Sequence, residues 1–334
     1  MEGDKGPVCV TGGTGFIGSS LIKRLLDRGY YVRTTVRSNA EQKKDTSFLT
    51  SLPGASEKLQ IFNADLSDPE SFNAPIEGCI GVFHVATPVD LQDREPEEIV
   101  TKRAISGALG ILQACLNSKT VKRVVYTSSA SAVVFNGVEA DEMDESFWSD
   151  VDFLKVKALK LFGSNSGSGS YTISKTLTEK AVLEFGEKHG LDVVTIIPSF
   201  VVGPFICPKL PGSVRSTLAM VFGDKDQYGT FINICMVHVD DVARAHIFLL
   251  ESSTAKGRYI CSSDLLTNEQ MPEFLSARYP EFQIPTPDSL KEIGGYKIPS
   301  LSSKKLLDSG FEYKYGLNEM FDEAIQCCKE KGFL

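Results

Sequence analysis

The sequence predicts an α/β protein built on a doubly wound parallel sheet, with a smaller C-terminal lobe. A strand, a glycine turn, a helix and a second strand follow one another at the N-terminus, and apolar runs of strand length then alternate with helical patterns. The chain has 334 residues, which is more than one small domain needs to bury a core. The apolar runs are continuous, as in parallel strands that are covered on both faces.

The first unit spans residues 7–37 and reads "PVCVTGGTGFIGSSLIKRLLDRGYYVRTTVR". Its turn glycines, Gly12, Gly15 and Gly18, have the spacing G-x-x-G-x-x-G. Such glycines allow a tight bend, close approach of the backbone to a pyrophosphate and close packing of helix on strand. The N–H groups at the helix start suit a phosphate anion. A plain turn is the alternative, but the position between a first strand and a helix favours dinucleotide binding by a Rossmann-type fold.

Four further apolar runs predict the strands that continue the sheet. They are "KLQIFNADL" (58–66), "GVFHVATP" (81–88), "VKRVVYTSSAS" (121–131) and "LDVVTIIPSF" (191–200). Helical patterns separate them, and "EPEEIVTKRAISGALGILQACLNS" is the clearest of these. Ligands of such sheets gather at the carboxyl ends of the strands, so the residues at these ends are the candidates for a binding site.

The second strand ends in "TTVRSN", where an NAD-binding protein usually carries an acidic residue for the ribose hydroxyls. Arg37 offers a guanidinium there instead, which suits the 2′-phosphate of NADPH. Lys43 and Lys44 follow and can add charge for the same phosphate, although a solvated pair is the alternative. We expect NADPH rather than NADH, with Arg37 more important than Lys44.

The third and fourth strands end in residues that suit the rest of a dinucleotide. Asp65 and Leu66 fit an adenine amino group and ring face, and the alternative for Asp65 is a helix cap. Val85, Ala86 and Thr87 are small and let the backbone approach a cofactor. The fifth strand ends in hydroxyls, "YTSSAS", at the same edge of the sheet.

The stretch "SGSGSYTISK" (166–175) places Tyr171 and Lys175 four residues apart, on one face of a predicted helix. A lysine that snorkels beside a half-buried ring is the alternative. With a strand-end serine the pair fits carbonyl reduction, because a carbonyl oxygen that becomes an oxyanion needs a proton donor and a hydrogen-bond donor. Tyr171 gives the proton in this hypothesis, and Ser129 holds the oxygen, with Ser128 the less favoured serine. Lys175 stabilises the phenolate and reaches the nicotinamide ribose.

Long stretches beyond these motifs resemble the extended short-chain dehydrogenases/reductases. "VCVTGGTGFIGS", "SKTLTEKAVLEFGE", "HVDDVARAHI" and "IQCCKEKG" are similar to the dihydroflavonol 4-reductase-like group, and within it to its isoflavanone reductases, over the whole chain. The resemblance implies NADPH/NADP+ as cofactor, a small hydrophobic ketone as substrate, a monomer, and a catalytic triad of Ser129, Tyr171 and Lys175. It implies cofactor contacts at Gly12, Gly15, Phe16, Ile17, Arg37, Lys44, Asp65, Leu66, Val85, Ala86, Thr87, Tyr171, Lys175, Pro198 and Val201. Pro198 and Val201 enter from the resemblance alone.

The predicted domains follow from the strand pattern and the resemblance. Residues 1–200 are expected to form the NADP-binding Rossmann domain, to which residues 236–255 return. Residues 201–334 are expected to form mainly the substrate-binding lobe. Its first segment is rich in Phe, Pro and Gly, and Phe205 and Phe222 either clamp a planar ligand or belong to an ordinary core.

Two departures from the group bear on the substrate. The segment 155–170 before the tyrosine is longer than its counterpart in the group, with several added Ser and Gly residues. These residues either alter the entrance of the site or form a tolerated surface insertion. Val134 stands where dihydroflavonol reductases carry an asparagine for ring hydroxyls, and an apolar side chain cannot make that hydrogen bond. "GSYTISK" also lacks the Asn-Trp-Tyr-Cys-Tyr run of cinnamoyl-CoA reductases. An isoflavanone or a related hydrophobic ketone is therefore favoured over a dihydroflavonol.

Composition argues against several other classes of protein. The net charge of -8 disfavours a nucleic-acid or anionic-membrane partner. We expect no signal peptide, because an apparent strand begins by Pro7, and no apolar run is expected to reach membrane-spanning length. Eight dispersed cysteines without C-x-x-C spacing indicate reduced thiols and a cytoplasmic protein.

No metal site is expected, because the four histidines lack a metal-binding spacing. His238 and Asp240, in "HVDDVARAH", are interpreted as structural, with an aspartate as the helix cap.

Two rival functions use the same cofactor site. One is a sugar-nucleotide epimerase or dehydratase, in which the cofactor is recycled rather than consumed. The other is a sensor that binds the cofactor without turnover, and the intact set of Ser, Tyr and Lys argues against it.

Overall fold

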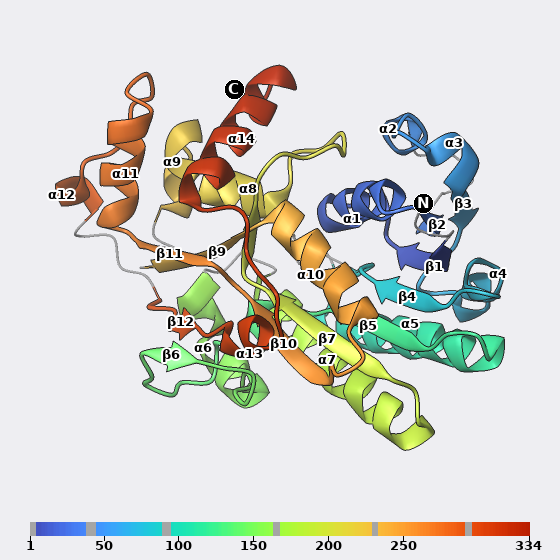
Figure 1. The fold of residues 1–334 in the computed structure, drawn as a ribbon. Helices are drawn as coiled ribbons and strands as arrows, with labels where there is room; N and C mark the ends of the chain where they lie inside the picture. The colour runs from blue at the N-terminus through green and yellow to red at the C-terminus, as the bar shows by residue number, and fades with distance from the viewer. Residues whose placement is uncertain (1–4, 38–44, 89–94, 163–167, 229–232, 291–295) are drawn as a thin grey trace.

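The computed structural model describes residues 5–334 apart from 38–44, 89–94, 163–167, 229–232 and 291–295. Its centre is a seven-stranded parallel sheet in the order β10-β7-β5-β4-β1-β2-β3 (Figure 1). The strands are β1 (Lys5–Thr11), β2 (Tyr30–Val36), β3 (Leu59–Asn63), β4 (Gly81–His84), β5 (Arg123–Thr127), β7 (Val193–Pro198) and β10 (Gly257–Cys261). The predicted doubly wound parallel sheet is thus confirmed, and the order changes direction between β1 and β4.

Four long helices cover the two faces of this sheet (Figure 1): α1 (Phe16–Asp27) with α10 (Val239–Glu251), and α5 (Glu97–Ser118) with α7 (Ser168–His189). Each pair closes a separate core. Within β1, Val8 and Val10 belong to the core of α1 and α10, whereas Cys9 belongs to the core of α5 and α7. Because successive residues of a strand point to opposite faces, a continuous apolar strand supplies both cores.

A second lobe contains a three-stranded sheet, in which β9 runs parallel to β8 and antiparallel to β11. Its elements are β8 (Phe200–Val202), β9 (Asn233–His238), β11 (Asp264–Thr267), α8 (Gly212–Thr217), α9 (Ala219–Phe222), α11 (Gln270–Arg278), α12 (Pro287–Leu290) and α14 (Leu317–Glu330). Phe205 is only 2% exposed in the core of this lobe, and Phe222 packs against that core. Both phenylalanines therefore follow the ordinary-core alternative rather than the ligand clamp.

Shorter elements complete the described chain. They are α2 (Ser47–Thr50), α3 (Ala55–Lys58), α4 (Asn73–Ile76), α6 (Val151–Phe162), α13 (Lys304–Asp308), the 3-10 helices η1 (Pro69–Phe72), η2 (Ala130–Ala132) and η3 (Lys225–Gln227), and the strands β6 (Glu142–Met143) and β12 (Ser300–Leu301), which pair with each other.

Residues 239–261 return from the second lobe to the large sheet. Helix α10 packs on α1, and β10 adds to the edge of the sheet beside β7. We expected 236–255 for this segment, but in the structure residues 236–238 belong to β9 of the small sheet, and β10 extends the return to Cys261. The assignment of the cofactor to one lobe and the substrate to the other stays a prediction.

Helix α5 is an exception to the expectation that no apolar run reaches membrane-spanning length. It has 22 residues and is long and apolar enough to cross a membrane by length and composition alone. Half of that stretch is buried inside the protein, and the helix packs along α7. This is how the central helix of a soluble fold is placed, so α5 is weak evidence for a membrane span.

The start of α10 differs from the expected aspartate cap. His238 is the N-cap residue, and its ring Nδ1 accepts a hydrogen bond from the Asp240 N–H at 3.1 Å. Its ring also stacks on Tyr315, with centroids 4.1 Å apart. Asp240 pairs with Arg24 of α1 instead of capping the helix. The structural interpretation of His238 and Asp240 holds, with the cap on the histidine.

Candidate active site

The glycine turn after β1 is packed against the end of β4. Gly12 has a φ of +73°, a conformation that side chains disfavour, and a Cβ atom there would lie 2.9 Å from the Cα of Ala86. A Cβ on Gly18 would lie 2.4 Å from the carbonyl oxygen of Gly12. Both positions therefore require glycine, one for the turn and the other for the packing of α1 on it.

Helix α1 begins at this turn with free donors. Gly15 is its N-cap residue, no side chain caps the helix, and its first turn carries no acidic residue. The first N–H groups of a helix have no partner within the helix, and they attract an anion. Phe16 and Ile17, the first two helical residues, are partly buried, and the Phe16 ring meets Phe205 of the second lobe edge-on at 6.3 Å.

Thr11 joins the ends of β1 and β4, a role that the sequence analysis missed. Its hydroxyl oxygen accepts hydrogen bonds from the N–H groups of Val85 and Ala86, each at 3.1 Å, and lies 2.9 Å from His84 Nδ1. Because the two amides donate to this oxygen, its proton points to the histidine, which must accept. Burial, with the nearby Lys175 charge, lowers the pKa of His84 to about 3, in keeping with a neutral ring.

Arg37 and Asp65 lie near each other after neighbouring strands β2 and β3. Arg37 is exposed, directly beyond the last residue of β2. Burial raises the pKa of Asp65, but hydrogen bonds from Ser67 and the charges of Arg37 and Arg103 outweigh it and leave this pKa below its ordinary value.

The carboxylate of Asp65 serves a local turn rather than a helix cap. Its Oδ1 accepts from the Ser67 N–H at 2.8 Å and from the Ser67 hydroxyl at 2.6 Å, whereas the N-cap residue of η1 is Asp68. Leu66 packs on α5, since a Cβ on Gly107 would lie 2.8 Å from its Cβ. The expected contacts at Lys43 and Lys44 lie outside the described residues.

The two serines after β5 have different environments. Ser128 is buried, and its hydroxyl donates to Oε2 of the buried Glu179 at 2.6 Å. Ser129 is half-buried and lies near enough to Tyr171 to lower the pKa of that phenol, and its hydroxyl accepts from the hydroxyl of Ser131 at 2.9 Å. The structure thus brings Ser129, and not Ser128, to the tyrosine.

Tyr171 and Lys175 lie one turn apart on α7, as the spacing predicts. The Lys175 amine is buried, and it donates to the Thr127 carbonyl at 2.7 Å and to the Thr87 hydroxyl at 3.1 Å. It therefore connects α7 to the end of β5 and to the segment that follows β4, and it does not snorkel into water.

Burial changes the ionisation of both side chains. It lowers the pKa of Lys175 to about 8, against the opposing charge of Glu179. Burial also raises the pKa of Tyr171, while the neighbouring hydroxyl of Ser129 works in the opposite direction. The phenol is therefore protonated at neutral pH, and the amine is mainly charged.

The remaining predicted contacts lie along the same carboxyl edge. Pro198 is the last residue of β7, and Val201 is a buried residue of β8, which follows at once. Most predicted residues thus lie at or just after the carboxyl ends of β1, β2, β3, β4, β5 and β7. Phe16 and Ile17 begin α1, Val201 lies on β8 of the small sheet, and α7 supplies the tyrosine and the lysine.

Comparisons with known proteins agree with this geometry. The chain matches the model described as "NAD dependent epimerase/dehydratase family" over residues 8–261. Vestitone reductase from Medicago sativa is 61% identical over 334 residues, covering 100% of both chains. Dihydroflavonol 4-reductase from Callistephus chinensis is 45% identical, covering 100% of this chain and 90% of that one. The crystal structure of vestitone reductase from alfalfa has a TM-score of 0.88 at 59% identity, covering 99% of this chain and 100% of that chain. The expected resemblance to the dihydroflavonol 4-reductase-like group is confirmed.

Proposed function

The chain belongs to the NAD dependent epimerase/dehydratase family, and from this membership we propose that it is an NADPH-dependent ketone reductase of the vestitone and dihydroflavonol reductase type. It reduces an isoflavanone or a related hydrophobic ketone to the alcohol. The observation that carries this proposal is the buried amine of Lys175, held by Thr127 and Thr87 one helical turn from Tyr171, with Ser129 close to that phenol. An acid, an oxygen-binding hydroxyl and a positive charge at one strand edge are what carbonyl reduction needs.

The described residues fit a dinucleotide. Glycine at positions 12, 13 and 15 leaves Thr14 as the one side chain of the turn, and the first N–H groups of α1 have no side-chain cap, which suits a pyrophosphate. Arg37 is exposed and suits the 2′-phosphate, and Lys175 suits the nicotinamide ribose. When bound, NADPH supplies the hydride that reduces the carbonyl carbon.

The side chains of the chain handle the proton and the charge. Tyr171 donates its proton to the carbonyl oxygen, and the hydroxyl of Ser129 donates a hydrogen bond to the same oxygen. The ammonium group of Lys175, one helical turn away, stabilises the phenolate that remains. Its bonds to Thr127 and Thr87 fix its position, so little reorganisation is needed during the reaction.

Val134 is buried and gives a dihydroflavonol no hydrogen bond at the position where an asparagine was expected for that substrate. Its side chain is 2% exposed and belongs to an apolar core with Phe135 and Ile173. Such a residue offers no hydrogen bond to a ring hydroxyl. Dihydroflavonol 4-reductase activity is the second candidate, supported by the 45% identity over the full chain.

The replacement Tyr171→Phe tests the mechanism. We expect kcat with a ketone to fall by a factor of roughly 10²–10⁴, because the proton donor is lost, while the Kd for NADPH changes little. Turnover is measured by the loss of NADPH absorbance, and the Kd by quenching of protein fluorescence. A Tyr171→Phe protein with wild-type kcat would refute the assigned role.

A substrate panel tests the reaction itself. Isoflavanones, dihydroflavonols and simple aromatic ketones are offered with NADPH, and NADH serves as the control. Net loss of NADPH with an isoflavanone supports the proposal and excludes an epimerase, which recycles its cofactor. Tight NADPH binding without turnover on any ketone would instead indicate a sensor.

A monomer in the cytoplasm is part of the same proposal. All eight cysteines are free and buried, as suits a reducing compartment. Light scattering during gel filtration should give a mass near 36.5 kDa. A mass of twice that value would contradict the monomer.

A further inference from the structure

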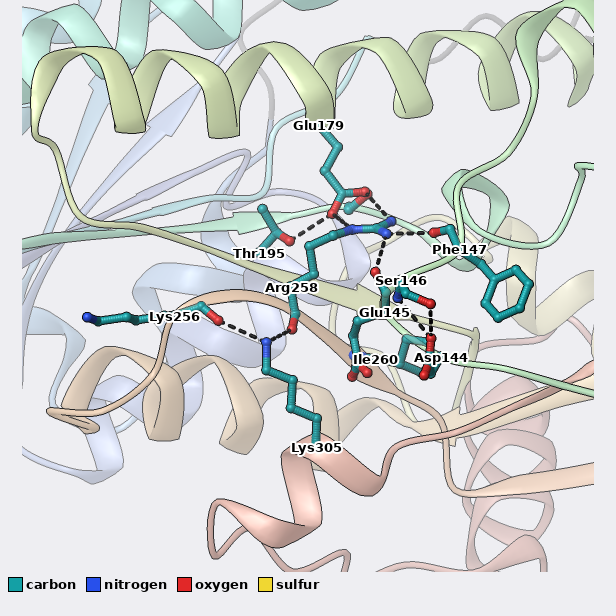
Figure 2. Close-up of polar contacts among 11 residues, drawn as sticks. Asp144, Glu145, Ser146, Phe147, Glu179, Thr195, Lys256, Arg258, Ile260 and Lys305 are labelled. Atoms are coloured by element: carbon teal, nitrogen blue, oxygen red, sulfur yellow. Dashed lines mark hydrogen bonds and ion pairs between the residues drawn. The ribbon is translucent and has the colours of Figure 1, made fainter.

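A buried ion pair lies behind the proposed catalytic residues. Glu179 of α7 is 0% exposed, and Arg258 of β10 is 7% exposed. Their two hydrogen bonds, Nε to Oε1 at 2.9 Å and Nη2 to Oε2 at 3.2 Å, are shown in Figure 2. Buried charges are costly unless they are paired and fully hydrogen-bonded, and a pair of apolar residues often stabilises a core as well. The pair therefore calls for a reason other than stability.

Two hydroxyls complete the bonding of the Glu179 carboxylate. Ser128 donates to Oε2 at 2.6 Å, and Thr195 of β7 donates to Oε1 at 2.7 Å. Ser128 is the neighbour of Ser129 in the chain, at the end of β5. The carboxylate thus holds the backbone from which Ser129 extends toward Tyr171.

Glu179 also shares a helix face with the catalytic pair. Tyr171, Lys175 and Glu179 follow one another at intervals of four residues on α7, so their side chains lie along one face. The carboxylate is thus one turn from the buried amine, on the side opposite to the phenol.

Arg258 has partners of its own. It donates to the carbonyls of Glu145 and Phe147 at 2.7 and 2.6 Å (Figure 2). Its guanidinium also lies 3.5 Å from the centroid of the Trp148 ring. These contacts anchor the arginine to the segment before α6. It is therefore also held by groups other than the carboxylate, and its charge offsets that of Glu179.

We propose that Glu179 is a positioning residue for the reduction: it fixes the end of β5 that presents Ser129, and its negative charge supports the ammonium group of Lys175. This inference rests on the proposed function of the same site, and it adds a residue that does not touch the substrate. Glu179 acts only through its two neighbours.

The charged and titratable groups around Lys175 determine its pKa, and so the pH at which the ammonium form is lost. They come from four elements: His84 on β4, Tyr126 on β5, Tyr171 and Glu179 on α7, and Arg258 on β10, bonded to Glu179. Burial lowers the pKa of Lys175 to about 8, and Glu179 works against burial. Removing the carboxylate charge must lower this pKa further, so the ammonium form is lost at a lower pH.

The decisive variant is Glu179→Gln, assayed as kcat against pH. We expect the fall of kcat on the alkaline side to begin at a pH roughly one unit lower than in the wild type. Thr195→Val is the matched control, because it removes a hydrogen bond to the same carboxylate and keeps the charge. Thr195→Val should lower the free energy of unfolding, but kcat should begin to fall at the same alkaline pH as in the wild type. Glu179→Asp should restore much of the wild-type profile. If kcat of Glu179→Gln begins to fall at the same alkaline pH as in the wild type, Glu179 does not support the Lys175 charge.

The link to Ser129 has its own test, which leaves the ion pair intact. Ser128→Ala should lower kcat by about tenfold to a hundredfold through misplacement of Ser129, with the pH profile and the Kd for NADPH unchanged. Ser129→Ala should lower kcat further. If Glu179→Gln fails to fold, Ser128→Ala still decides this part, since a wild-type kcat would refute it.

A direct titration separates this inference from the proposed function. Lysine labelled with ¹³C at Cε is followed by NMR against pH, and Lys175→Met assigns the signal of Lys175. If no ketone consumes NADPH but this signal titrates at lower pH in Glu179→Gln and not in Thr195→Val, the support of the Lys175 charge stands and the reductase assignment fails. If ketones are reduced but the signal and kcat of Glu179→Gln match the wild type, the inference fails alone.

Discussion

Arg37 is an exposed guanidinium directly beyond β2, and its charge helps to lower the pKa of Asp65, against the burial that raises it. Its place at the carboxyl end of a strand is where an adenosine ribose is recognised in this type of fold. An acidic residue there would repel a 2′-phosphate and accept hydrogen bonds from ribose hydroxyls. This single side chain is therefore expected to decide between the two nicotinamide cofactors.

The variant Arg37→Asp should lower kcat/KM for NADPH by about tenfold to a hundredfold, because a charge-assisted hydrogen bond is replaced by repulsion. The value for NADH should stay level or rise, and initial rates with each cofactor give the ratio. Lys119→Asp is the control, because it changes the net charge equally. Lys119 directly follows α5, at the amino ends of the strands and away from the site. Its φ is 56°, a conformation that Asp adopts more readily than most residues. An equal loss in both variants would point to a general charge effect.

At the scale of elements, the β1–α1 turn depends on contacts that only glycine permits. A Cβ on Gly18 would lie 2.4 Å from a backbone oxygen of the same turn, so α1 must move away to admit it. Gly212, the first residue of α8, has no atom within 4 Å of the position that a Cβ would take. Gly18 is therefore tightly packed and Gly212 is not, although both lie in the first turn of a helix.

We expect Gly18→Ala to lower the free energy of unfolding by about 1–3 kcal/mol, because overpacking forces the helix to shift. It should also weaken NADPH binding. Gly212→Ala should leave the stability within about 1 kcal/mol of the wild type or raise it, since it restricts the unfolded chain. Urea unfolding at a fixed pH measures both. A harmless Gly18→Ala would show that the turn is looser than its packing indicates.

At the scale of the whole molecule, three buried histidines connect the sheet, the helices and the second lobe. Burial lowers the pKa of His84 to about 3, and it lowers those of His238 and His246 to about 4. His246 Nδ1 lies 2.7 Å from the Val242 carbonyl and must donate to it, so Nε2 accepts from the Thr127 hydroxyl at 2.8 Å. A proton on Nε2 would reverse the direction of that bond and place a charge in a buried site, which burial opposes.

Stability should therefore fall in mild acid. An unfolded histidine has a pKa near 6.5, so below that pH the unfolded chain binds protons that the folded chain excludes. The loss grows by about 1.4 kcal/mol per pH unit for each histidine, until the pH reaches the pKa of the folded state near 4 for His246.

Urea unfolding between pH 7.5 and 4.5 tests this expectation. His246→Gln should unfold with a shallower pH dependence, smaller by the share of one histidine. The same slope in wild type and variant would contradict the assignment of His246 as a buried neutral group.

Much of the site followed from local sequence. The glycine spacing, the arginine after the second strand and the spacing of Tyr171 and Lys175 each depend on residues close together in the chain, whose geometry is fixed by the turn or the helix that holds them. The sequence favours Ser129 over Ser128, and in the structure Glu179 engages Ser128. The catalytic role of Ser129 stays a prediction. The substrate contacts stay predictions.

The sequence by itself determined the parallel α/β sheet and the reductase type of the site, because strand periodicity, turn glycines and helix spacing are local properties. Tertiary structure alone decided that β10 completes the sheet, that His238 caps α10, that Thr11 joins two strands, and that Arg258 meets Glu179. Those contacts join residues far apart in the chain, except for the cap, which required a side-chain orientation. No pattern along the sequence specifies which buried donor meets which acceptor; the packing of the strands and helices does.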